Sequence, residues 1–127
     1  AMYSGKNNNV VSELISSYAW DTALNFICQT DTEGYKLATT TSSSYGNIGT
    51  GSKKNTGVDT NDNYSNIHDL LGNCYEWTTE YSSYSNNPCV DRGGYYRNSN
   101  HYAALRYGND TSDAVAGISF RLQLYVK

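Results

Sequence analysis

The sequence has no excess of basic residues, no long apolar run and only two histidines. Nine Lys and Arg residues face twelve Asp and Glu residues, so the formal net charge is −3. This balance gives no basic surface for nucleic acid, and we expect no nucleic-acid partner. No stretch approaches the roughly 20 consecutive apolar residues of a membrane span, so we expect no membrane insertion.

Cysteine is also scarce, which restricts both disulfides and metal sites. Three cysteines leave at least one unpaired, and the sequence leaves a pairing of Cys74 with Cys89 open. Cys28 falls on an apolar helical pattern and is expected to be a small buried hydrophobic residue. No spacing of cysteine and histidine resembles a zinc site.

Tyrosine, asparagine and serine are abundant instead, with 13 Tyr, 15 Asn and 15 Ser in 127 residues. Antibody binding surfaces use the same residue types, because tyrosine gives a large contact area at low entropic cost and small polar residues adapt their hydrogen bonds. The alternative is that tyrosine fills half-buried strand positions. For the chain as a whole, both interpretations stay open.

The length fits one domain over residues 1–127, which would bury about two-thirds of its unfolded surface. Two N-terminal helices are predicted. The first follows a cap at Asn9, and the second runs from residue 18 or 19 to 27. The first prediction depends on apolar residues at helical spacing, namely Val10, Val11, Leu14, Ile15 and Tyr18.

The rest of the chain reads as loops and short strands. Residues 39–63 are mostly Thr, Ser, Gly and Asn, and we expect a long polar loop laid over the domain. Residues 102–107 and 118–126 read as strands, and strict alternation in the second predicts a half-buried antiparallel strand. The predicted class is therefore α+β, with a small, irregular antiparallel sheet.

Three short blocks follow one another in a fixed order: residues 67–78 (IHDLLGNCYEWT), 92–96 (RGGYY) and 117–122 (GISFRL). The order resembles the formylglycine-generating-enzyme family, also called sulfatase-modifying-factor domains. That family's blocks read roughly Asp/Asn-x-x-Gly-Asn-x-Trp-Glu-Trp, Arg-Gly-Gly-Ser and Gly-Phe-Arg. The resemblance covers residues 66–124, about half the chain. It implies a variant of the C-type lectin fold, but a fold alone does not fix an activity.

The residues that the family's oxidases need are missing. Those enzymes depend on copper and use a pair of cysteines shortly after the Gly-Gly pair, whereas this chain has no cysteine beyond Cys89. A Cu(I) centre requires thiolate ligands, so we expect no copper and no enzymatic activity. An iron-dependent relative would need a histidine-rich site, and His68 belongs to the first block, which leaves only His101.

The resemblance also implies a structural calcium site. Family members place calcium ligands at the positions matching Asp69, Gly72, Cys74 and Glu76, two through side chains and two through backbone carbonyls. Calcium accepts such a mixed set of oxygens. The alternative is that Asp69 and Glu76 only hydrogen-bond the tight turn around Gly72.

Four other residues of the blocks are predicted to be structural. Tyr75 and Trp77 are expected to fill the core beside the turn. Arg92 and Arg121 are expected to tie strand ends to carboxylates or carbonyls from a buried or half-buried position.

Residues 95–115 differ in kind from the blocks around them. In the family this stretch forms the exposed surface where substrate binds. It also resembles the variable region of proteins diversified by retroelements, in which mutagenesis yields mostly Asn, Tyr, Ser, His and Asp. An exposed cluster of aromatic and Arg residues is typical of a contact site. We expect the ligand to be bound by Tyr95, Tyr96, Arg97, Asn98, Asn100, His101, Tyr102, Tyr107, Asn109, Asp110, Ser112 and Asp113.

This face should tolerate substitution of Asn98, Asn100 and Asn109, with Ala103, Leu105 and Phe120 buried beneath it. The sequence therefore predicts a non-enzymatic binding domain for a protein or glycan receptor on a cell surface. We expect it to be extracellular, on a phage virion or a bacterial cell surface. A carbohydrate-binding module is the alternative, since tyrosine stacking and amide hydrogen bonds suit sugars equally well. An oxidoreductase of the resembled family is a more distant one.

Overall fold

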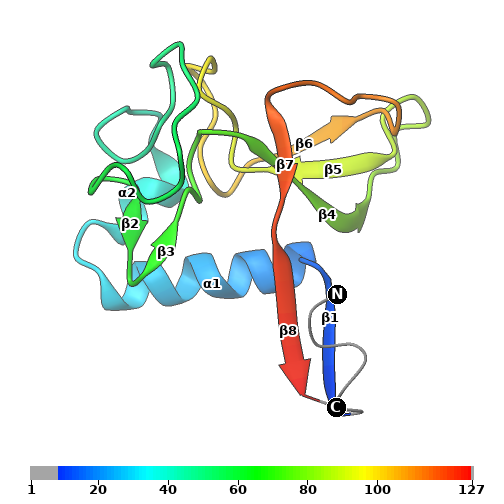
Figure 1. The fold of residues 1–127 in the computed structure, drawn as a ribbon, viewed down its shortest axis with the longest axis horizontal. Coiled ribbons are helices and arrows are strands. Elements are labelled where there is room, and N and C mark those ends of the chain that lie inside the picture. The colour runs from blue at the N-terminus through cyan, green and yellow to red at the C-terminus, as the bar shows by residue number, and fades with distance from the viewer. Residues whose placement is uncertain (1–8, 127) are drawn as a thin grey trace.

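The computed structural model describes residues 9–126 (Figure 1). Two helices and eight short strands alternate with long loops, which fits the predicted α+β class. Among the described residues no helix is both long and apolar enough to cross a membrane. The elements are β1 (Val10–Leu14), α1 (Ser17–Thr30), α2 (Gly34–Thr39), β2 (Asn63–Tyr64), β3 (Ile67–His68), β4 (Tyr75–Tyr81), β5 (Cys89–Arg92), β6 (Arg106–Asn109), β7 (Ile118–Phe120) and β8 (Leu122–Val126).

The largest sheet has four strands in the order β6-β5-β4-β7. The β6–β5 and β5–β4 pairs are antiparallel as expected, whereas β4 and β7 are parallel. Helix α1 lies along one side of this sheet, and the β1–β8 ribbon projects away from it (Figure 1). The sheet therefore has one face toward α1 and one face directed away from it.

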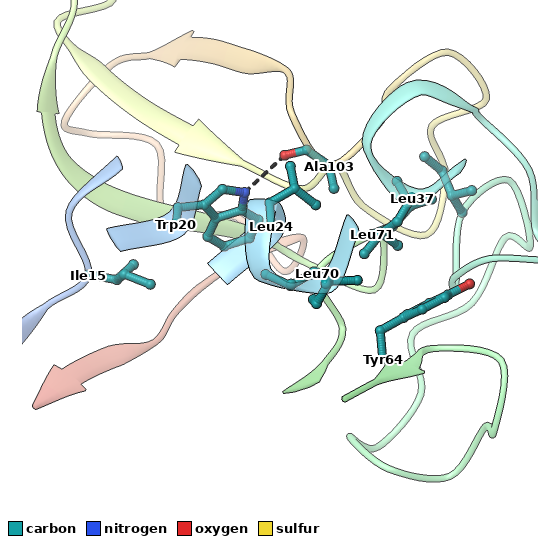
Figure 2. Close-up of a cluster of buried hydrophobic side chains, with 10 residues drawn as sticks. Ile15, Trp20, Leu24, Leu37, Tyr64, Leu70, Leu71 and Ala103 are labelled. Carbon is teal, nitrogen blue, oxygen red and sulfur yellow. Dashed lines mark hydrogen bonds between the residues drawn. The ribbon is translucent and has the colours of Figure 1, made fainter. Parts of the chain in front are cut away.

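Helix α1 supplies much of the core. The Ser16 hydroxyl accepts a hydrogen bond from the backbone N–H of Ala19, which caps the first turn. Trp20, Leu24 and Ile27 recur at helical spacing and are buried, and they pack with loop residues into one cluster (Figure 2). Trp20 is fully buried, and its indole nitrogen donates to the carbonyl of Ala103 at 2.9 Å.

Two arginines flank the Trp20 ring. The guanidinium of Arg92 lies 5.7 Å and that of Arg121 5.4 Å from the ring centroid. Arg92 is fully buried and pairs with Asp21, and Arg121 pairs with Glu76. The prediction that both arginines tie strand ends to carboxylates is confirmed.

The first predicted helix is wrong. Residues Val10–Leu14 form strand β1, which pairs antiparallel with β8 along its whole length. Val10 lies opposite Val126 and Leu14 opposite Leu122, so a distant strand supplies the partner that decides between helix and strand. Asn9 therefore caps no helix, and within residues 9–126 the second helix is α2.

The C-terminal strand is also not continuous. It breaks at Arg121, so that β7 joins the large sheet and β8 pairs with β1. The predicted buried face is wrong, because Phe120 is 64% exposed and Val126 76% exposed. The strand expected at 102–107 is found as β6, which begins four residues later and ends two residues later.

The long polar loop is confirmed between α2 and β2. It is held against the body by Ile48, which is buried, and by Asn47, whose amide donates to the Asn73 side chain at 3.2 Å. Asn47 also forms a bridge to Gly72 in the turn before β4. A Cβ added to Gly72 would lie 2.2 Å from the Asn47 carbonyl oxygen, so only glycine allows this approach.

Replacing Trp20 tests how much the core between α1 and the sheet contributes to the free energy of unfolding. Trp20→Phe removes the donor to Ala103 and leaves space in the core, so we expect a loss of about 2–4 kcal/mol in the free energy of unfolding. The matched control is Phe26→Ala on the same helix, where the ring is half exposed and the change should stay within about 0.5 kcal/mol. Urea titration of both variants gives the comparison, and equal losses would contradict it.

Candidate functional site

The face of the large sheet that points away from α1 carries a row of cross-strand partners. Asp91 on β5 pairs with Trp77 on β4 and with Tyr107 on β6, and Tyr75 pairs with Ile118 on β7. Directly paired residues of neighbouring strands project to the same side. Arg92, one position along β5, contacts Asp21 of α1 and so marks the opposite face.

A depression of about 480 Å³ lies on this outer face. Two segments supply most of its lining: the stretch after the Gly-Gly pair and the stretch that joins β6 to β7. The lining residues are Tyr75, Tyr95, Tyr96, Arg97, Asn98, Tyr107, Asn109, Asp113, Val115, Ala116, Gly117 and Ile118.

Stacked rings form the aromatic part of the depression. The Tyr75 ring centroid lies 5.0 Å from that of Tyr95 and 5.8 Å from that of Tyr107, with near-parallel planes. Gly117 is required beside this row, because a Cβ there would lie 2.6 Å from the Tyr95 ring. The tyrosines therefore present a preorganised, amphipathic surface.

His101 lies behind the rings rather than in the depression. It is buried, and its Nδ1 shares a hydrogen bond of 3.0 Å with the Tyr75 hydroxyl. Burial lowers the pKa of His101 and raises that of Tyr75. Both groups are consequently held neutral, and His101 supports the ring arrangement.

Asp91 lies beneath the depression with no exposed surface. Its Oδ2 accepts a hydrogen bond from the Asn109 amide, and its Oδ1 has no hydrogen-bond partner within residues 9–126. Burial raises the pKa of Asp91 to about 7; the Asn109 hydrogen bond opposes the shift and the Asp113 charge adds to it. A carboxyl group close to its titration point thus lies under the site.

The structure brings together seven of the twelve residues predicted to bind ligand: Tyr95, Tyr96, Arg97, Asn98, Tyr107, Asn109 and Asp113 line the depression. The other five do not line it. His101 is buried and Tyr102 half-buried, whereas Asn100, Asp110 and Ser112 are exposed elsewhere.

Two asparagines of the predicted site are more than surface amides. Asn98 accepts from the backbone N–H of Tyr95 at 2.9 Å, and Asn109 donates to Asp91. The expectation that both can be replaced freely conflicts with these contacts. Of the residues expected beneath the surface, Ala103 is fully buried and Leu105 half-buried, while Phe120 is exposed, so its predicted burial is wrong.

Sequence reasoning missed Tyr75 and residues 115–118 as parts of the site. Tyr75 is buried, as the sequence predicts, yet it also lines the depression. Trp77, also expected in the core, is only half-buried. Alternation along β4 could have placed Tyr75 and Trp77 on one face, but their neighbours come from distant strands.

The four residues predicted to bind calcium lie in and beside the turn before β4. Both carboxylates already have partners: Asp69 accepts from the Thr56 hydroxyl at 2.8 Å and the Asn73 amide at 3.1 Å, and Glu76 is bound by Arg121. Among the residues that the structure describes, no three His, Cys, Asp or Glu side chains are grouped to hold a metal ion. The geometry fits the hydrogen-bonded turn better than the calcium set.

The cysteines of the described part of the chain are all free thiols. Cys28, Cys74 and Cys89 are half-buried. Cys74 and Cys89 form no disulfide, so the pairing that the sequence left open is not found. Cys28 is less buried than its helical pattern predicts. Burial raises the pKa of Cys74, which disfavours the reactive thiolate form.

Comparison with known proteins gives one solved structure with a related fold. No family model and no curated protein matches the sequence. The fold is similar to that of Treponema denticola variable protein 1, with a TM-score of 0.65 over 91% of this chain at 17% sequence identity. The match covers 48% of that protein, so this chain spans about half its length.

This likeness supports a variable-protein fold and is consistent with the predicted C-type-lectin type. It lends no support to membership of the formylglycine-generating-enzyme family itself.

Asp91→Asn tests the buried carboxyl group. Because the folded-state pKa of Asp91 is raised above its ordinary value of 3.8, protonation favours the folded state, and that stability is lost as the pH rises through about 7. The stability difference between wild type and the asparagine variant should shift by about 2 kcal/mol between about pH 5.5 and about pH 8.5. Urea titrations at both pH values measure it. The control is Glu13→Gln, an exposed acid on β1, and an equal shift there would contradict the assignment.

Chelation tests the calcium prediction. Since the carboxylates of Asp69 and Glu76 are held by protein donors, we expect the same melting temperature with calcium and with a chelator. A ligand that binds only the folded state would raise the melting temperature with its concentration. A calcium-dependent rise that Asp69→Ala removes would instead support the calcium site.

Proposed function

We propose that this chain is a non-enzymatic ligand-binding domain that uses the depression on the outer face of the large sheet. Its ligand is a protein or glycan receptor on a cell surface, and the domain acts outside the cell, on a phage virion or a bacterial surface protein. The observation that carries this proposal is that the two faces of one sheet differ: one packs on the core, and the other carries the depression.

The face toward α1 carries the core, with Trp20, Arg92 and Leu24 all buried. The opposite face carries the depression, where Arg97 and Tyr107 are exposed. Exposed side chains such as Arg97 and Tyr107 can be replaced without removing core contacts. A surface that is selected for binding requires this tolerance. The rings and amides that line it are the residue types of adaptable binding surfaces.

A non-enzymatic role fits the chemistry of the lining. The three cysteines all precede Gly93, and the one histidine near the depression is buried against Tyr75. His68 belongs to β3, and its ring faces Asp62 instead. Neither histidine is therefore placed as a nucleophile or base at the depression.

A diversified binding surface fits both the residue palette and the fold. The segment 95–113 is rich in Tyr, Asn, Ser, His and Asp, the residues that the resemblance to retroelement-diversified proteins implies. A solved structure with a similar fold is named a variable protein. We propose that this segment is the variable part and that the α1 face is the constant scaffold.

Binding to defined arrays tests the proposal. The labelled domain should bind saturably to at least one member of a glycan array or of an array of bacterial surface proteins. The double variant Arg97→Ala/Tyr107→Ala should weaken that binding about tenfold or more, because contact residues of these types dominate interface energies. Its melting temperature should stay close to that of wild type.

The matched control is Tyr18→Ala/Lys36→Ala, which removes another tyrosine and another cation, on α1 and α2, neither of which lines the depression. This variant should bind like wild type. Binding to glycans alone would assign the domain to carbohydrate recognition. Absence of saturable binding on both arrays, or equal loss in the two double variants, would refute the proposed site.

A further inference from the structure

We propose that the ligand presents a positively charged nitrogen to the acidic end of the depression, where Asn109 and Asp113 lie above the buried Asp91. This inference rests on the proposed function and specifies the chemistry of the group that the site recognises. A lysine or arginine side chain of a protein and the amine of an amino sugar share this chemistry.

Asp91 is the first observation. It lies at the centre of the outer face, paired with Trp77 on one side and Tyr107 on the other, and has no exposed surface. Within residues 9–126 no cation forms an ion pair with it, and its Oδ1 has no donor. A buried carboxylate without a cation is costly, because the single amide hydrogen bond from Asn109 replaces its lost hydration only in part.

Asp113 is the second observation, and it comes from a different segment. Its backbone N–H donates to the Asp110 carbonyl at 3.1 Å, which fixes the turn that carries it. Its carboxylate lines the depression and has no hydrogen-bond or ion-pair partner in the described part of the chain. It lies close enough to Asp91 for the two charges to repel. The fold thus holds Asp91 and Asp113 close together with no cation of the described chain paired to either.

The protein's own cation near the depression does not fill this role. Arg97 is the one basic residue of the lining, and its guanidinium lies over the Tyr96 ring, 5.4 Å from the centroid. It pairs with neither Asp91 nor Asp113. The corresponding acids on the other face are neutralised: Arg92 pairs with Asp21, and Arg121 with Glu76.

A ligand cation would supply what this end of the depression lacks. A positive charge stabilises the ionised form of a neighbouring carboxyl group, whereas an anion would add to the existing repulsion. Asn109 lines the depression and is held by Asp91, so its carbonyl oxygen can accept from the ligand while its amide donates inward. The adjacent Tyr107 ring adds a cation–π contact.

Small cationic probes test the assignment in the intact domain. Nα-acetylarginine amide and Nα-acetylcitrulline amide are nearly isosteric, and only the first is charged. Glucosamine and N-acetylglucosamine form a second pair that differs in charge. Titrations up to tens of millimolar, followed by backbone amide NMR shifts, detect weak binding. We expect Nα-acetylarginine amide or glucosamine to shift the signals of Asn109 and Gly117, and each neutral analogue to bind at least fivefold more weakly.

Variants locate the charge. Asp113→Asn and Asp91→Asn should each weaken binding of the cationic probe about tenfold, as expected for loss of a charged partner. Glu33→Gln removes one negative charge just before α2 and should leave the affinity unchanged. Melting curves of the three variants identify any that fail to fold, and Asp113→Asn, which breaks no contact in the described structure, keeps the test valid in that case.

Equal binding of charged and neutral analogues, no binding of either cation, or full affinity in both aspartate variants would overturn the assignment. Failure of the charge assignment can be distinguished from failure of the proposed function. A domain that binds an array member through Arg97 and Tyr107 but ignores both cations keeps its function and loses only the charge assignment. Which cation binds distinguishes a protein side chain from an amino sugar.

Discussion

The arrangement of Trp20 between two arginines is the interaction on which the rest of this structure depends. The indole is fully buried, its N–H is bound by the Ala103 carbonyl, and Arg92 and Arg121 lie near its ring. These groups come from α1, from the loop before β6, from β5 and from the break between β7 and β8. One side chain thus joins four distant parts of the chain, in a protein with few large apolar residues to do so.

This arrangement explains why the two faces of the sheet differ in their electrostatics. On the α1 face Arg92 and Arg121 each have a carboxylate partner, because an unpaired charge next to the core would be costly. On the outer face neither Asp91 nor Asp113 has a cation partner within residues 9–126. The buried core therefore lies on one side of the sheet, and the acids without a cation partner lie on the other, where a ligand can reach the lining.

Sequence reasoning succeeded where the information is local. The helix around Trp20, the polar loop after α2 and the carboxylate partners of Arg92 and Arg121 all follow from spacing and residue type. It failed where the partner is distant. Val10 to Leu14 fit a helix by spacing, and only the antiparallel partner β8, more than a hundred residues later, makes them a strand. The alternation from Ile118 onward predicted one strand, and the inward turn of Arg121 divides it.

For the site, the sequence determined which residue types are available: aromatic rings, amides and acids after Gly94, and no thiol for oxidase chemistry. Which of those residues share a surface was decided by the tertiary structure. Pairing of β5 with β4 and β6 brings Asp91 beside Trp77 and Tyr107, and the parallel pairing of β7 with β4 places Gly117, just before β7, against the Tyr95 ring. The physical reason is that residue types set what a side chain can bind, whereas strand pairing between distant segments sets which side chains meet and which charges remain without a partner.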